Sequence, residues 1–163
     1  MRTLFLVRHA KSDWNDHEFN DFERPLNQKG LRNAPMMAQR LKILNIPLEK
    51  ILASPAIRAI TTAQIFAEFL DYPVNKIQKV QELYQADTKK FLEIINNLPK
   101  EAHTVMIFGH NPTLTNMVEY LADHKLDKLP TTGIAMIAFD VDDWKMVSQD
   151  SGELKMLDYP KKV

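Results

Sequence analysis

Two arginines and two histidines of this chain follow apolar runs of the sequence. Arg8 and His9 come directly after one such run near the N-terminus, and His110 comes after another in the second half. Arg58 follows a third run, at the start of a segment with helical periodicity. In an open sheet of mostly parallel strands, ligands bind outside the carboxyl ends of the strands, so we expect these four side chains to reach one crevice. A crevice lined by four cationic or potentially cationic groups is suited to an anion.

Phosphoryl transfer is the chemistry that these residue types predict. It needs charge donors that are in place before charge redistributes, together with an in-line nucleophile. Arg8 and Arg58 would supply planar, bidentate donors that keep their protons. The helix start at Arg58 would add free backbone N–H groups and a positive dipole end. His9 would be the nucleophile, because a neutral imidazole has a free lone pair and the surrounding cations should lower its pKa.

The elements that must position these residues alternate between short apolar runs and longer helical segments, which is typical of an α/β layered sheet. The predicted strands cover residues 3–8, 50–53, 77–80, 104–109 and 134–140, with a weaker edge strand near 144–149, and the predicted helices cover 28–44, 56–70, 88–98 and 113–122. Asn27 is the predicted N-cap of the first helix, and Pro35 is expected to kink that helix or divide it into a turn and a longer helix. Residues 11–25 are expected to form a long loop over the mouth of the crevice, and residues 158–163 a polar, frayed end.

Size and composition bound the remaining possibilities. The 163 residues suit a single domain that spans residues 1–163. Lys plus Arg and Asp plus Glu both number 21, so the formal charge of zero gives no global attraction to nucleic acid or to anionic membranes. The sequence has no apolar stretch of the roughly 20 residues that a membrane helix needs. It has no cysteine, which suits a reducing compartment. We expect a cytoplasmic monomer without nucleic-acid or membrane partners.

Three motifs resemble the signatures of the histidine phosphatase superfamily, which also includes the cofactor-dependent phosphoglycerate mutases. Residues 6–15, Leu-Val-Arg-His-Ala-Lys-Ser-Asp-Trp-Asn, resemble its Arg-His-Gly signature. Residues 54–63 and 109–112 resemble its second and third signatures, in the same order. The resemblance runs from Met1 to about Phe139. It implies a phosphoglycerate mutase-like fold, a three-layer α/β/α sandwich around a mostly parallel central sheet.

The resemblance also implies roles for individual residues. His9 would be the nucleophile that takes the phosphoryl group and later yields it to water. The phosphoryl oxygens would be clamped by Arg8, Arg58 and His110. Glu82 would be the general acid that protonates the leaving group. The expected substrate contacts are Asn15, Lys11 and Ser12.

Two positions depart from the family pattern, and one of them bears on the reaction. Ala10 stands where glycine is commoner, which changes little because alanine is nearly as small. Lys11 stands where mutases carry glutamate, so it adds a positive charge and disfavours a mutase. A mutase must also retain its dephosphorylated intermediate under a lid, and 163 residues leave little material for one. The small size and residues 22–26 are most similar to the compact SixA-type phosphohistidine phosphatases.

A phosphohistidine protein is the substrate class that this branch implies. An open pocket would admit a phosphorylated protein side chain, and imidazole is a good leaving group, so Glu82 would matter for phosphoesters and hardly at all for phosphoramidates. The sequence therefore predicts a metal-independent phosphatase that forms a phosphohistidine intermediate and needs no cofactor. The alternative within the superfamily is a phosphomonoesterase that acts on a small phosphorylated metabolite.

Two other classes of function use the same residues. A metal-dependent hydrolase could take His9, His110, Asp13 and Glu82 as ligands, but two arginines beside a dication would be repulsive and no His-x-x-His spacing is present. A binding module could recognise a phosphorylated ligand without turning it over, although arginines alone would suffice for that task. Activity that is insensitive to a chelator would separate the metal-independent phosphatase from a metal-dependent hydrolase. Acid-labile phosphate on His9 after mixing with substrate would separate it from a binding module.

Overall fold

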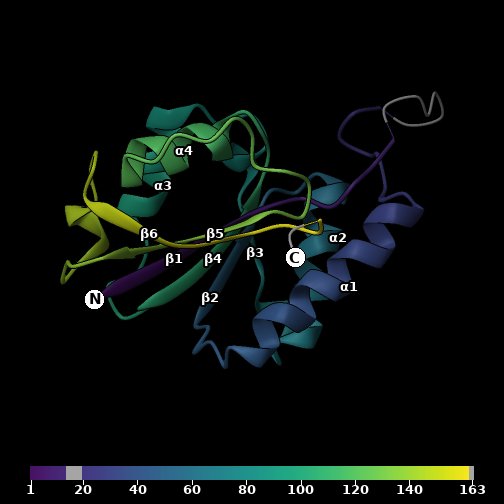
Figure 1. Cartoon of the computed structure of the whole chain (residues 1–163), viewed down its shortest axis with the longest axis horizontal. Coiled ribbons are helices and arrows are strands. Elements are labelled where there is room, and N and C mark those ends of the chain that lie inside the picture. Colours follow the sequence, from purple (N-terminus) through teal and green to yellow (C-terminus); the bar gives the residue numbers. More distant parts are fainter. Residues whose placement is uncertain (14–19, 162–163) are drawn as a thin grey trace.

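The computed structural model describes residues 1–13 and 20–161 of the chain. A sheet lies between two pairs of helices, with α3 and α4 on one face and α1 and α2 on the other (Figure 1). The strands are β1 (Arg2–Arg8), β2 (Lys50–Ala53), β3 (Gln78–Lys79), β4 (Thr104–Gly109), β5 (Ile134–Phe139) and β6 (Gly152–Asp158). The helices are α1 (Gln28–Ile43), α2 (Ile57–Phe69), α3 (Thr88–Asn96) and α4 (Thr113–Ala122), with short 3-10 helices η1 (Val74–Lys76), η2 (Gln81–Leu83) and η3 (Trp144–Met146).

The sheet is mostly parallel, with strand order β3-β2-β4-β1-β5-β6. Strands β3, β2, β4 and β1 pair in parallel, while β5 and β6 add to the far side of β1 in antiparallel pairings. β1 is a central strand because its run from Leu4 to Val7 is fully buried, as a strand covered by helices on both faces requires. The predicted three-layer α/β/α sandwich with a mostly parallel sheet is confirmed.

Each face of the sheet has its own apolar core. Alternate residues of β1 point to opposite faces, so Leu4 and Leu6 join the core under α3 and α4 while Phe5 and Val7 join the core under α1 and α2. Phe91 and Met117 fill the first core, and Met37 and Phe66 the second; all four are almost fully buried. These two cores hold α2 and α4, whose N-terminal ends border the site described below.

The first helix differs from its prediction at Pro35. Asn27 caps the helix as predicted, since its side-chain oxygen accepts the N–H of Gly30 at 2.8 Å. The expected division into a turn and a longer helix is wrong, because α1 runs without interruption through Pro35. A proline inside a helix costs one backbone hydrogen bond. Burial of Met37 and Leu41 against the sheet offsets that cost.

The end of the chain also differs from the prediction. The expected edge strand near 144–149 is wrong: the segment begins as η3, and the last strand is β6. Trp144 is the reason, since its ring is fully buried and its indole N–H donates to the carbonyl of Ala102 at 2.6 Å. The frayed end predicted from Asp158 onward is wrong at that residue, which closes β6 and pairs with Arg40 at 3.0 Å.

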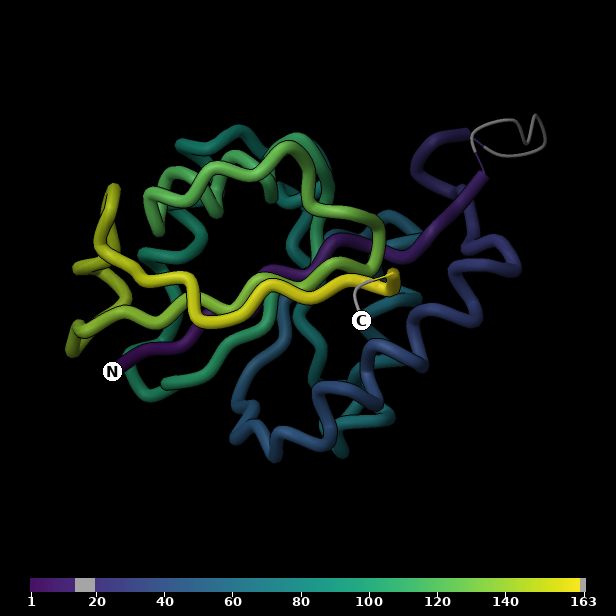
Figure 2. Tube along the Cα trace, in the orientation of Figure 1, coloured from purple at the N-terminus to yellow at the C-terminus, as the bar shows by residue number. Residues whose placement is uncertain are grey.

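The carboxyl end of β1 meets the segment that precedes β5 (Figure 2). The N–H of Thr132 lies 3.1 Å from the carbonyl of Arg8 and 3.0 Å from that of His9, and the N–H of Arg8 donates to Gly133 at 3.0 Å. These bonds tie two segments that are far apart in the sequence into one end of the sheet.

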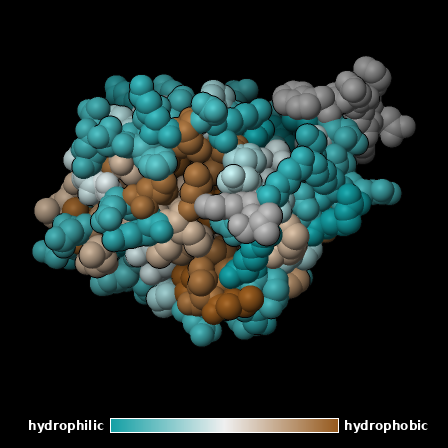
Figure 3. Space-filling model, in the orientation of Figure 1, coloured by the Kyte–Doolittle hydropathy of each residue, from teal (hydrophilic) through white to brown (hydrophobic). Residues whose placement is uncertain are grey.

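The surface in the view of Figure 3 is largely polar, with apolar side chains gathered in the middle of that face and at its lower margin. Exposed apolar residues of the chain include Ile43 and Leu44 at the end of α1. Among the helices of the described residues, no segment has the length and apolarity that spanning a membrane requires.

Candidate active site

A pocket of about 360 Å³ lies beyond the carboxyl ends of β1 and β4. It is lined by Arg8, His9, Lys11, Ser12, Arg24, Arg58, His110, Asn111, Lys128, Pro130 and Thr131. The two arginines and two histidines that the sequence singled out are therefore brought together at one place. They come from the ends of β1 and β4 and from the first turn of α2, as the parallel topology requires.

The two histidine rings stand side by side in this pocket. Their centroids are 5.2 Å apart and their planes are inclined by 50°. His9 Nδ1 lies 2.8 Å from the carbonyl oxygen of Ala10. Because a carbonyl can only accept, Nδ1 carries the proton and Nε2 keeps its lone pair in the neutral ring. The Ala10 N–H in turn donates to the hydroxyl oxygen of Thr62 at 3.0 Å, which fixes the backbone that orients His9.

Both imidazoles are held in the neutral form. Burial lowers the pKa of His9 well below 6.5, the hydrogen bond to Ala10 partly offsets this, and the positive charges of Arg58 and Arg8 lower the pKa further. Burial and the charge of Arg58 lower the pKa of His110 to about 3. At neutral pH the lone pair on Nε2 of His9 is therefore free, and no base is needed to deprotonate the ring.

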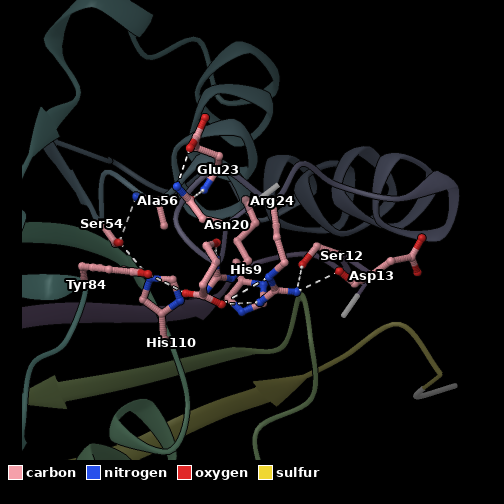
Figure 4. A network of polar contacts seen from close by, with 12 residues as sticks. His9, Ser12, Asp13, Asn20, Glu23, Arg24, Ser54, Ala56, Tyr84 and His110 are labelled. Atoms are coloured by element: carbon pink, nitrogen blue, oxygen red, sulfur yellow. Dashed lines mark hydrogen bonds and ion pairs between the residues drawn. The ribbon is translucent and has the colours of Figure 1, made fainter. Parts of the chain in front are cut away.

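His110 is held by Ser54 and Tyr84. Its Nε2 lies 2.8 Å from the hydroxyl oxygen of Ser54, which also accepts the backbone N–H of Ala56 at 3.3 Å. The edge of the Tyr84 ring packs on the imidazole, with centroids 5.8 Å apart and planes at 75°. Figure 4 shows His110 placed between Tyr84 and His9. These contacts fix the ring that faces the nucleophile.

Arg58 lies in the first turn of α2, as predicted, and it is buried. Its guanidinium donates from Nη1 to the carbonyl of Asp21 at 2.7 Å and from Nη2 to the Asp21 carboxylate at 3.2 Å. The side chain of Arg8 donates from Nη1 to the carbonyl of Leu129 at 3.1 Å. Burial and the charge of Arg58 lower the pKa of Arg8 from its ordinary value. The two guanidinium groups thus repel each other, which an anion between them would relieve.

Asp21 links three side chains of the site, and sequence reasoning did not find it. One carboxylate oxygen accepts from Arg24 at 3.0 Å, and the other accepts from Arg58 and from the hydroxyl of Tyr84. Burial alone raises the pKa of Asp21, but the hydrogen bond from Tyr84 and the charge of Arg58 lower it to about 2. The carboxylate is therefore ionised and is unable to donate a proton. A signal was present, since buried arginines need a carboxylate and residues 11–25 contain several.

Arg24 is a second residue that sequence reasoning missed. Its guanidinium is buried and donates from Nη1 to the hydroxyl of Ser12 at 2.9 Å and to the carbonyl of Asp13 at 3.1 Å. With its ion pair to Asp21, Arg24 joins the two ends of the loop that borders the pocket (Figure 4). A third arginine therefore lines the pocket beside Arg8 and Arg58.

Buried polar atoms without a partner are concentrated at this site. In the described residues, such side-chain atoms include Nε of Arg8, Nε of Arg58 and Nδ1 of His110. All three residues line the pocket. Buried polar groups normally have a hydrogen-bond partner, and exceptions need an explanation. A site with surplus donors and few acceptors is suited to a phosphoryl group, which brings several acceptor oxygens.

The remaining predicted site residues have different positions. Lys11 is exposed and lines the pocket, and Ser12 is buried and held by Arg24. Glu82 is exposed in η2 and lines two neighbouring hollows between η2 and α3, but not the pocket of His9. Asn15 lies outside the described residues.

Four further lining residues were not predicted as site residues: Asn111, Lys128, Pro130 and Thr131. Asn111 directly follows His110, and its side chain donates to the carbonyl of Leu129 at 2.9 Å. Lys128 and Thr131 come from the segment before β5, which carries no sequence signal for a binding site beyond its polar composition.

The four residues of the alternative metal site are not brought together. Within residues 1–13 and 20–161, no group of three His, Asp, Glu or Cys side chains is placed to hold a metal ion. His9 and His110 adjoin each other, but Glu82 lines different hollows. Asp13 is exposed and bound to the side chain of Asn27.

Comparisons with known proteins agree with this fold. The uncharacterized protein ML1117 of Mycobacterium leprae is 30% identical over 169 residues, which cover 95% of this chain and 100% of the relative. The structure of the protein histidine phosphatase SixA in complex with tungstate has a TM-score of 0.83 at 23% identity, covering 97% of both chains. A candidate phosphohistidine phosphatase SixA from Agrobacterium tumefaciens has a TM-score of 0.81 at 26% identity, covering 98% of both chains.

The sequence profile of one family matches more than half of the chain. The profile of the histidine phosphatase superfamily (branch 1) matches residues 4–103, a range that includes the carboxyl end of β1 and the start of α2. The motif of His110 lies beyond that range, and the structure brings it to the same pocket. With the motifs, the fold and the site in agreement, the chain belongs to the histidine phosphatase superfamily.

Proposed function

We propose that this protein is a phosphatase that hydrolyses phosphohistidine on proteins through a covalent phosphohistidine intermediate on His9, without a metal ion. The observation that carries the proposal is the neutral His9 ring, whose Nδ1 proton is bound by Ala10, beside two arginines and His110 in one pocket. Membership of the histidine phosphatase superfamily and the fold shared with the protein histidine phosphatase SixA support phosphatase activity.

The reaction would proceed in two displacements. His9 Nε2 attacks the phosphorus atom, the bond from phosphorus to the substrate nitrogen breaks, and that nitrogen keeps the electron pair. Water then attacks the phosphorus atom on His9, the N–P bond breaks, and inorganic phosphate leaves. Arg8 and Arg58 hold the phosphoryl oxygens while charge redistributes, and His110 supplies a further donor.

The missing acid in the pocket supports phosphohistidine as the substrate class. Among the described residues, no carboxylic acid lines the pocket, and the nearby Asp21 carboxylate has a pKa of about 2. Hydrolysis of an alkyl phosphoester would need an acid to protonate the leaving alkoxide. The imidazole of phosphohistidine is a good leaving group and depends less on such an acid. Glu82 as general acid stays a prediction for phosphoester substrates, and it would have to act from the rim between η2 and α3.

A comparison of three substrate types tests the proposal. The purified protein is assayed for kcat/KM with a phosphohistidine peptide, an aryl phosphate and a sugar phosphate, each with and without a chelator. We expect the highest kcat/KM with the phosphohistidine peptide and no effect of the chelator. Acid quenching should trap acid-labile phosphate on His9. A higher kcat/KM with the sugar phosphate would favour the small-metabolite alternative, and turnover without a phosphoenzyme would reject the mechanism.

A cytoplasmic location and a monomeric state stay predictions. The location rests on the absence of cysteine, and the monomer on the lack of a coiled-coil pattern or surplus apolar surface in the sequence. Sedimentation of the purified protein at several concentrations would test the monomer.

A further inference from the structure

The pocket has more positive charge than a phosphoryl group uses. Permanently charged side chains in its lining are Arg8, Lys11, Arg24, Arg58 and Lys128, and no Asp or Glu of the described residues is among the lining. The chain as a whole has a formal charge of zero, so this excess is local. Two arginines suffice for the phosphoryl oxygens in the proposed mechanism. Arg24 is engaged with Ser12 and with Asp21.

Lys11 and Lys128 account for the remaining charge. Both side chains are exposed at the pocket, and within the described part of the chain neither forms an ion pair with a carboxylate. A solvated lysine on an ordinary surface needs no explanation. Two unpaired lysines that line the same small pocket from segments over a hundred residues apart provide a cationic rim for a ligand.

The backbone that carries Lys11 is fixed by the start of α1. The carbonyl of Lys11 accepts the N–H of Asn27 at 2.9 Å. Gly30 packs so closely on this backbone that a Cβ atom at its position would lie 2.3 Å from the carbonyl oxygen of Lys11. Lys11 therefore extends from an anchored backbone and not from a free loop.

The backbone that carries Lys128 is fixed by the site itself. The carbonyl of the next residue, Leu129, accepts from Arg8 at 3.1 Å and from the side chain of Asn111 at 2.9 Å. The N–H of Leu129 donates to the hydroxyl of Thr115 at 3.0 Å. The backbone at both lysines is thus held by contacts with other parts of the fold, so the fold sets the distance from the phosphoryl-binding groups to the two points where the lysine side chains begin.

We propose that Lys11 and Lys128 form a second anion subsite, which selects substrates that carry a carboxylate or another anionic group beside the phosphoryl group. This inference rests on the proposed phosphatase function and adds the charge of the preferred substrate. A protein substrate would meet the subsite with acidic residues next to the phosphohistidine. A small substrate would meet it with its own carboxylate or second phosphate.

Matched pairs of substrates test the subsite. The first pair is 4-carboxyphenyl phosphate and its neutral counterpart 4-carbamoylphenyl phosphate. The second pair is a phosphohistidine peptide with aspartates beside the phosphohistidine and the same peptide with asparagines. The measured quantity is the ratio of kcat/KM within each pair, at low salt and at about 0.5 M salt.

We expect the anionic member of a pair to have a kcat/KM about threefold to tenfold higher at low salt, mostly through KM, because each exposed ion pair contributes little. The ratio should fall toward one at high salt, where the Debye length is only a few ångströms. The variant K11Q/K128Q should bring the ratio close to one at low salt. The control variant Lys125→Gln, in the same segment as Lys128 but lining another hollow, should keep the wild-type ratio.

Each outcome separates the two proposals. Equal kcat/KM within both pairs, with clear turnover, would overturn the subsite and leave the phosphatase function intact. No turnover of any substrate would overturn the proposed function. A ratio that persists in K11Q/K128Q would also overturn the subsite. A preference confined to the peptide pair would identify a protein surface as the source of the second anion, and one confined to the aryl pair a small molecule.

Discussion

At the scale of single residues, the surroundings of His9 and His110 determine what each ring can do. Burial lowers the pKa of both, and the arginine charges lower it further. For His9 the result is a free lone pair at neutral pH, since its Nδ1 proton is held by Ala10. For His110 it is a neutral ring held by Ser54 in the absence of a ligand. Neighbouring groups thus prepare the proposed nucleophile and the proposed donor from the same type of side chain.

Removal of the nucleophile or of one guanidinium group should separate their roles. His9→Ala is expected to abolish turnover, because it removes the nitrogen atom that would form the covalent intermediate. Arg58→Ala should lower kcat/KM by about a hundredfold or more, the usual effect of losing one preorganised donor. Arg58→Lys should recover only part of the lost kcat/KM, because a lysine ammonium group cannot form the two parallel hydrogen bonds that a guanidinium group forms. Steady-state kinetics and acid-quench labelling measure both effects, and wild-type rates in His9→Ala would contradict the mechanism.

A bound dianion should change the protonation of His110. Its pKa of about 3 results from burial and from the charge of Arg58. Sulfate stays a dianion throughout the relevant pH range and would offset that charge, so the pKa of His110 should rise by at least about one unit. Proton NMR titration of the histidine signals with and without sulfate measures this change. His103, which does not line the pocket, is the internal control; equal shifts for both histidines would indicate a general salt effect.

At the scale of elements, the site depends on how the loop before α1 is joined to α2 and η2. Asp21 in this loop binds Arg24 of the same loop, Arg58 of α2 and Tyr84 next to η2. Phe22 packs edge-on against Tyr84, with centroids 5.1 Å apart. One exposed carboxylate thus positions two of the three arginines that line the pocket.

Asp21→Asn should weaken the positioning of Arg58 and Arg24 without removing either. The neutral amide keeps the size of the side chain but accepts more weakly from the guanidinium groups. We expect a loss of about tenfold or more in kcat/KM, measured at a temperature where the variant is still fully folded. The control is Asp13→Asn in the same loop, whose carboxylate is bound to Asn27 and not to an arginine. Equal effects of the two substitutions would contradict a specific role of Asp21.

The contact between α1 and the end of β1 is equally specific. Gly30→Ala would place a Cβ atom 2.3 Å from the carbonyl oxygen of Lys11, so helix or loop must move. We expect a loss of about 1–3 kcal/mol in the free energy of unfolding. Gly109→Ala is the matched control, because its Cβ atom would meet Leu114 at 3.6 Å, an ordinary contact. Urea unfolding of both variants measures the difference, and equal stabilities would show that α1 shifts freely.

At the scale of the whole molecule, the two histidines of the site lower the free energy of unfolding at acidic pH. His9 and His110 have lowered pKa values in the folded protein and ordinary values near 6.5 when unfolded. At a pH between the folded and the unfolded pKa values, the unfolded chain binds more protons than the folded protein. The contribution of the neutral histidines to the free energy of unfolding is therefore fully present above about pH 6.5 and falls as the pH decreases. The burial of the histidines beside the cationic side chains of the pocket therefore makes the protein without ligand sensitive to acid.

The expected loss can be measured. For His110, with a pKa of about 3, lowering the pH from 7 to 5 should cost about 2 kcal/mol of unfolding free energy. His9 adds a loss of the same sign. Urea unfolding at both pH values tests this, with His110→Gln as the variant in which this contribution is absent. An unchanged pH dependence in His110→Gln would show that His110 is not the source. The lowered pKa of Asp21 acts in a separate pH window, because its contribution to stability is lost as the pH falls from the ordinary value of 3.8 to about 2.

The sequence by itself determined the layered α/β architecture and the four residues at the centre of the site. Fully apolar runs such as Leu4 to Val7 fit only strands that are buried on both faces, so their order along the chain predicts a parallel sheet. Because parallel strands end at a common edge, His9 and His110 could be placed together without coordinates. The local chemistry of Asn27 likewise predicted the start of α1.

Only the tertiary structure decided the features that depend on distant contacts. The burial of Trp144 replaced an expected strand by a short helix, and packing carried α1 through Pro35. Asp21 and Lys128 reached the site through loops that have no periodic pattern, so no local rule could place them. Loop positions follow from which donors and acceptors find partners after the sheet has formed, and that information is absent from any single stretch of sequence.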